Sequence, residues 1–97
     1  MKIKTILIIN QQISVIFEQS WFQEDIETLS QLILVKLPKH IIKEVTFGAD
    51  RENIRFQWQH AEFMMNFDYY SQSCWINAQD ENSLTNIEPL YNFLTKS

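Results

Sequence analysis

The sequence predicts a two-layer α+β fold, in which six antiparallel strands form one sheet and a long helix packs on one face of it. Six short segments alternate apolar and polar residues with the period of a β-strand, and one longer segment repeats its apolar residues with the period of an α-helix. The length of 97 residues, with 45% hydrophobic and 21% charged residues, is typical of one globular domain. We therefore expect residues 1–97 to form a single α+β domain with the element order ββαββββα.

The chain begins with two strand-like segments, Ile3–Ile9 and Ile13–Glu18, which the polar residues 10–12 join as a hairpin. Residues 6–9 are apolar on both sides of the first segment, so we expect this strand to lie in the interior of the sheet. The run is shorter than the ~7–15 residues of a signal-peptide core, and no run approaches the ~20 residues that cross a bilayer. With one cysteine in the chain, the sequence favours a cytoplasmic protein without membrane contact.

A long helix is predicted over Trp21–Leu37. Ser20 and Gln23 have the spacing of a capping box, in which each side chain bonds a free backbone N–H at the helix start. Pro38 ends the helix because proline has no backbone N–H. The apolar residues of the segment recur at intervals that place them on one helical face: Phe22, Ile26, Leu29, Ile33 and Leu37.

Four more strands are predicted after the helix, at Ile41–Phe47, Asn53–Gln59, Glu62–Tyr70 and Ser73–Ala78. A turn at His60-Ala61 would place Phe56 opposite Met65, with apolar partners on the face that packs against the helix. On the other face, the same turn would place Arg55 opposite Asn66.

A second turn at Ser71-Gln72 would place Phe67 opposite Ile76 on the core face and Asp68 opposite Trp75 on the other. The simplest connected sheet then has the strand order 2-1-3-4-5-6. A short C-terminal helix over Asn86–Lys96 completes the fold.

Several short motifs in residues 40–78 resemble a family of small bacterial proteins that is classed as a domain of unknown function. The motifs are Gly48-Ala49-Asp50 after a strand, then Trp58, Asn66-Phe67, Asp68-Tyr69-Tyr70 and Trp75-Ile76. The resemblance implies a small bacterial cytoplasmic protein and no activity, ligand or catalytic residue.

No catalytic or metal site is predicted from the reactive residue types. Cys74, His60 and Asp68 could form a nucleophilic triad, but the predicted register places Cys74 on the core face and Asp68 on the other. His40 and His60 lack the spacing of metal ligands, so we expect no metal or cofactor. The single glycine, Gly48, is interpreted as a turn residue that supplies a positive φ or allows close approach.

The charge distribution argues against nucleic acid as a partner. The net charge is −4, and residues 49–97 carry seven acidic against three basic residues. An acidic surface repels phosphate backbones but suits a basic protein partner.

The face of the sheet away from the helix is the candidate binding surface. Trp, Tyr, Met and Arg are the residue types enriched at protein interfaces. The residues predicted to bind a partner on this face are Arg55, Met64, Asp68, Tyr70 and Trp75.

The sequence thus favours a non-catalytic protein-interaction module that uses an open, mildly acidic sheet face. An immunity-like inhibitor of a basic partner is one form of this hypothesis. The alternative is a small-molecule-binding protein or enzyme with a pocket between the sheet and the C-terminal helix. A homodimer joined through sheet edges or faces is a third interpretation.

Overall fold

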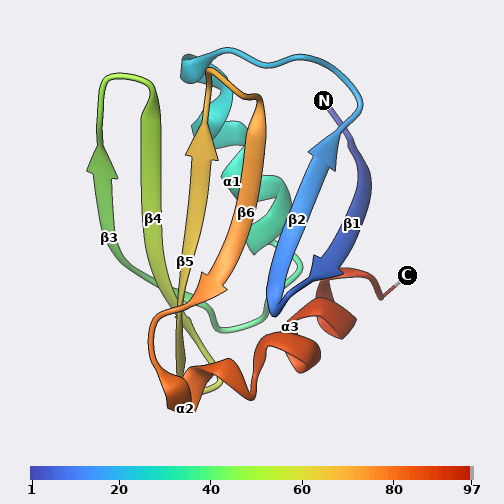
Figure 1. The fold of residues 1–97 in the computed structure, drawn as a ribbon, viewed down its shortest axis with the longest axis vertical. Coiled ribbons are helices and arrows are strands. Elements are labelled where there is room, and N and C mark those ends of the chain that lie inside the picture. The colour runs from blue at the N-terminus through green and yellow to red at the C-terminus, as the bar shows by residue number, and fades with distance from the viewer. Residues whose placement is uncertain (97) are drawn as a thin grey trace.

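The protein is an α+β fold built on one open, six-stranded antiparallel sheet (Figure 1). The computed structural model describes residues 1–96; residue 97, the last of the predicted domain, lies outside the described residues. The strands are β1 (Ile3–Ile9), β2 (Gln12–Phe17), β3 (Ile41–Phe47), β4 (Arg51–Trp58), β5 (Ala61–Asp68) and β6 (Ser73–Ala78). The helices are α1 (Ile26–Leu34), preceded by the 3₁₀ turn Gln23–Asp25, then α2 (Glu81–Leu84) and α3 (Ile87–Leu94).

The strand order is β1-β2-β6-β5-β4-β3, so the predicted order was wrong. The last strand, β6, pairs with β2, and Ile13 lies opposite Ile76 with both side chains fully buried. The prediction placed β1 in the interior, but β1 is an edge strand, and β3 is the opposite edge (Figure 1). The physical reason is that the helical connection from β2 to β3 carries the chain across the whole sheet, which leaves the central position beside β2 free for β6.

The hairpin registers differ from the predicted ones by two residues, although the faces are correct. β4 and β5 are joined by Gln59 and His60, both with positive φ (51° and 65°), rather than by His60-Ala61. Such pairs of left-handed residues match the right-handed twist of the flanking strands. Consequently Phe56 lies opposite Phe63.

The same shift occurs at the β5–β6 connection, where residues 69–72 form a longer loop than predicted. Phe67 lies opposite Cys74, and Asp68 opposite Ser73 instead of Trp75. Trp75 lies opposite Asn66, which the prediction had paired with Arg55. A shift by two residues keeps every side chain on its predicted face.

The helical segment after β2 is shorter than predicted and begins later. Phe22, not Ser20, is the N-terminal cap, and its N–H donates to the Asp25 carboxylate at 2.9 Å. Phe22 itself is 60% exposed, and the neighbouring Trp21 is buried against Phe67 in its place. The ordered helix ends at Leu34, and Leu37 is still buried in the turn that follows.

The core lies between the sheet and the helices on one side. α1 contributes its buried apolar face, and α3 packs against β1 and β2 with Leu90 and Leu94 fully buried. The ring of Phe93 meets Trp58 edge-on at 5.2 Å, and Trp58 belongs to the core face of β4. Both helices therefore cover the same face of the sheet.

Gly48 lies in the β3–β4 turn, as predicted, but neither of the predicted reasons for glycine applies there. Its N–H donates to the Arg51 carbonyl at 2.7 Å, and its φ is not positive. A Cβ at this position would lie 3.6 Å from the nearest atom, the same carbonyl oxygen, which is an ordinary contact. Neither a positive φ nor a close approach therefore requires glycine here.

Candidate functional site

The open face is the side of the sheet opposite the helices, and no element among residues 1–96 covers it. Arg55, Met64, Asp68 and Trp75 all lie on this face, because they alternate with buried core residues along β4, β5 and β6. Tyr70 does not: it lies beyond the end of β5 in the loop, with 83% of its surface exposed. Four of the five predicted residues therefore share one surface.

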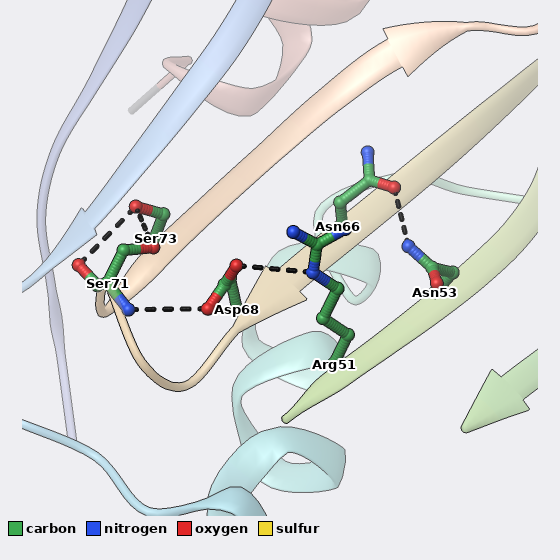
Figure 2. A network of polar contacts seen from close by, with 6 residues as sticks. All are labelled: Arg51, Asn53, Asn66, Asp68, Ser71 and Ser73. Carbon is green, nitrogen blue, oxygen red and sulfur yellow. Dashed lines mark hydrogen bonds and ion pairs between the residues drawn. The ribbon is translucent and has the colours of Figure 1, made fainter. Parts of the chain in front are cut away.

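The charged groups of the open face are paired with one another. Arg55 lies 3.7 Å from a carboxylate oxygen of Glu44 and 3.7 Å from one of Glu62. Arg51 lies 3.3 Å from Asp68, whose carboxylate also accepts a hydrogen bond from the Ser71 N–H (Figure 2). Each arginine is thus ion-paired with an acidic side chain of a neighbouring strand.

An asparagine ladder crosses the middle of the open face. Asn53 donates to the Asn66 amide oxygen at 2.7 Å, a bond drawn in Figure 2, and Asn66 donates to Asn77 at 2.7 Å. The Asn66 amide nitrogen also lies 3.2 Å from the Trp75 carbonyl, and Asn66 is buried. The ladder fixes three adjacent strands beside Trp75.

A cluster of apolar side chains lies on the part of the open face formed by β1, β2 and β6. Leu7 lies opposite Ser14, and Ser14 lies opposite Trp75, so these three residues form one row across the sheet. Ile9 and Ile16 share this face, and both are exposed, as is Leu7. This apolar cluster thus adjoins the asparagine ladder, which ends at Asn77 of β6, and the ion pairs beyond it.

A second feature lies on the helix side, where α1 leaves edge strand β3 uncovered. A groove of about 470 Å³ runs between them. Its apolar lining includes Ile42, Val45 and Phe47, which are all exposed on β3. The remaining lining residues are Gln23, Glu24, Glu27, Ser30, Gln31, Glu52 and Ile54.

Comparison with known protein families gives one match. The family model described as "Protein of unknown function (DUF3630)" matches residues 3–96. The chain belongs to the DUF3630 family. No curated protein and no solved structure matched it.

The family match extends the resemblance seen in residues 40–78 to nearly the whole DUF3630 chain. The family description names no activity, and the open face and the groove are the two surfaces that bear on function.

The reactive residues of this DUF3630 protein do not lie together in one site. Cys74 is buried on the core face, and burial raises the pKa of its thiol. Asp68 points to the other face, and His60 lies in the β4–β5 turn. Within the first 96 residues, no group of three His, Cys, Asp or Glu side chains could hold a metal ion. None of the described helices has the length and apolar character to span a bilayer.

The DUF3630 structure shows two features that the sequence did not predict, a set of apolar residues on the open face and one buried glutamate. Leu7, Ile9 and Ile16 lie beside Trp75 on the open face because β2 pairs with β6, a neighbour that the predicted strand order did not give. Glu52 faces the core side of β4, in phase with Ile54. The alternation of polar and apolar residues along β4 would have placed Glu52 on the core face, but the predicted strand began at residue 53.

Proposed function

We propose that this DUF3630 protein is a non-catalytic interaction module that binds a protein partner through the open face. One observation carries the proposal: the exposed side chains of Leu7 and Ile16 and the half-buried ring of Trp75 lie on three adjacent strands beside a polar network, on a face without a covering element in residues 1–96. Interfaces commonly combine an apolar centre with a polar rim in this way.

Trp75 is the proposed anchor of the interface. A tryptophan ring contributes a large contact area and has few rotatable bonds, so little entropy is lost when it is buried by a partner. The Asn66 amide bonds the Trp75 carbonyl, and the ladder on either side keeps this part of the backbone in place. The ion-paired Arg55 would then offer a positioned donor at the rim.

The acidic character of the chain favours a basic partner. The net charge is −4, and opposite charges speed the encounter of two proteins and exclude wrong partners. An immunity-like inhibitor of a basic protein is the narrower form of the proposal.

The test compares proteins retained from a native lysate by immobilised wild-type protein and by Trp75→Ala. The matched control is Val35→Ser, a change at an exposed apolar residue on the helix side. We expect the wild type and the control to retain the same partner. Trp75→Ala should bind the purified partner about 30-fold more weakly, which corresponds to about 2 kcal/mol.

The free energy of unfolding separates this result from a folding defect. Because Trp75 points away from the core, Trp75→Ala should change this free energy by less than about 1 kcal/mol. Equal partner binding by Trp75→Ala and wild type, or a large loss of stability, would contradict the proposal.

A further inference from the structure

The groove between α1 and β3 combines apolar and acidic side chains. Ile42, Val45 and Phe47 lie opposite residues of β4 whose side chains face α1, so they belong to the helix side of the sheet. α1 does not reach over them, and Phe47 keeps 71% of its surface exposed. Among the lining residues, three are glutamates and none is basic.

Glu52 is the unusual member of this lining. It is only 7% exposed, and its side chain forms no hydrogen bond or ion pair with any of residues 1–96, so its carboxylate oxygens keep only the contact with solvent that the groove allows. A buried ionised carboxylate is costly unless it is paired with a cation or accepts hydrogen bonds. Loss of water around Glu52, and second the nearby Glu27, raise the pKa of the Glu52 carboxyl. A cation in the groove would oppose both effects, because it stabilises the ionised form of the carboxylate.

The outer edge of β3 borders the groove along its length. The sheet ends at β3, so the outward backbone groups of this strand have no strand partner within the described chain. A bulge at residues 42–44 interrupts the strand, and residues 44–47 beyond it pair regularly with β4. An exposed edge of this kind can accept an extended peptide as an additional strand, while alternate side chains of the peptide enter neighbouring pockets.

We propose that this groove binds an extended basic segment of another protein, which adds a strand along residues 44–47 of β3 and places a lysine or arginine side chain against Glu52. The apolar contacts would come from Val45 and Phe47. This second surface is separate from the open face, because the two lie on opposite sides of the sheet.

The observations favour a basic peptide over two other occupants. A small organic cation could neutralise Glu52 but would leave the exposed apolar side chains along β3 uncovered. A second copy of this chain would bring another groove with Glu24, Glu27 and Glu52 to the interface, and each copy carries a net charge of −4. Charge complementarity therefore selects a basic segment.

The test uses a synthetic eight-residue peptide of sequence Val-Thr-Lys-Thr-Val-Thr-Lys-Thr with blocked ends, which places both valine and lysine on one face of an extended strand. Binding is followed by fluorescence anisotropy, and the contact site by amide hydrogen exchange. We expect saturable binding that weakens with salt, with slower exchange in residues 44–47. The same peptide with glutamate in place of each lysine should not bind. The same basic peptide with alternate backbone nitrogens methylated should bind at least 10-fold more weakly, since it cannot complete the strand ladder.

Protein variants locate the charge contact. Glu52→Gln should weaken binding of the basic peptide at least 10-fold. Glu62→Gln is the matched control, because Glu62 belongs to a neighbouring strand and lies on the open face. Trp75→Ala should bind the peptide as the wild type does, so this proposal and the open-face proposal can fail independently.

Four results would overturn the proposal. The first is equal binding of the peptide by Glu52→Gln and wild type. The second is equally tight binding of lysine amide, which would indicate a site for a small cation. The third is slower exchange in β1 instead of β3. The fourth is self-association of the free protein in sedimentation that Phe47→Ser abolishes, which would assign the groove to a second copy.

Discussion

The side-chain amide of Gln72 holds the backbone of Trp21 at both of its polar groups. The Trp21 N–H donates to Gln72 Oε1 at 2.8 Å, and Gln72 Nε2 donates to the Trp21 carbonyl at 2.9 Å. The same nitrogen also donates to the Tyr69 carbonyl at 2.9 Å. Residues 51 positions apart in the chain are thereby joined, and the β5–β6 loop is fixed to the segment that leads into α1. This clamp holds Trp21 with its ring edge-on to Phe67, at 5.8 Å.

Replacing Gln72 with alanine should lower the free energy of unfolding by about 1–3 kcal/mol, because three hydrogen bonds are lost and Trp21 keeps unpaired backbone groups. The free energy of unfolding of Gln72→Glu should lie between those of the wild type and Gln72→Ala, since a carboxylate accepts from the Trp21 N–H but cannot donate. Urea denaturation followed by tryptophan fluorescence measures both. Gln19→Ala, an exposed site, is the control and should change stability by less than about 0.5 kcal/mol. A similar effect for Gln72→Ala and Gln19→Ala would contradict the role of the clamp.

Phe67→Ala should cost about 3–5 kcal/mol of stability. Phe67 is fully buried between the sheet and Trp21, and removing its ring leaves a cavity that the surrounding side chains fill only in part. Phe47→Ala removes the same atoms from an exposed ring and should cost less than about 1 kcal/mol. Thermal or urea unfolding of the two variants gives the comparison. Equal losses would mean that the assignment of faces is wrong.

The faces of the strands were predictable because alternation survives errors in register. The predicted β4–β5 and β5–β6 registers were both displaced by two residues, since the sequence did not show that Gln59 and Gln72 adopt positive φ. Glutamine does not favour the left-handed region, so the residue types at these positions did not indicate the turns. A register shift by two residues leaves each side chain on the same face of the sheet. The core residues Phe56, Met65 and Ile76 were therefore assigned correctly.

The strand order was not predictable from local pattern. Hairpins connect neighbours, but the long connection from β2 through α1 to β3 fixes no particular neighbour. The apolar run at residues 6–9 suggested an interior strand, yet Leu7, Ile8 and Ile9 remain exposed on the edge strand β1. Because the pairing of β2 with β6 was not predictable, the apolar cluster of the open face could not be foreseen. The positions of Trp75 and Arg55 on this face could be, since they follow from alternation alone.

The Cys74 thiol should resist alkylation in the native protein. Burial raises its pKa, so the reactive thiolate is scarce at neutral pH, and reagent must also reach a side chain that is closed off by the core. We expect labelling by iodoacetamide to follow global unfolding in urea. Cys74→Ser should destabilise the fold by about 1–3 kcal/mol, because the hydroxyl is buried in an apolar site. Rapid labelling without denaturant would contradict this assignment and revive a nucleophilic role.

Glu52 should make the protein less stable as the pH rises. The pKa of Glu52 is raised in the folded state, first by loss of water and then by Glu27, above the ordinary value of 4.5. Between the unfolded and the folded pKa, the native state binds more protons than the unfolded state, so the free energy of unfolding falls with increasing pH. Below about pH 4.5 the carboxyl is protonated in both states, and this effect disappears.

Glu52→Gln isolates this contribution, because the amide has nearly the same shape and does not ionise. The variant and the wild type should have similar stability near pH 4, and the variant should become the more stable of the two as the pH rises towards neutrality. Urea denaturation at a series of pH values measures the difference. Adding Glu27→Gln should reduce this difference in stability, since it removes the repulsion between Glu27 of α1 and Glu52. Glu88→Gln, at an exposed site on α3, should leave the difference unchanged. If instead the wild type gains stability over Glu52→Gln with rising pH, Glu52 has a cationic partner in the free protein, and the groove does not hold an unpaired carboxylate.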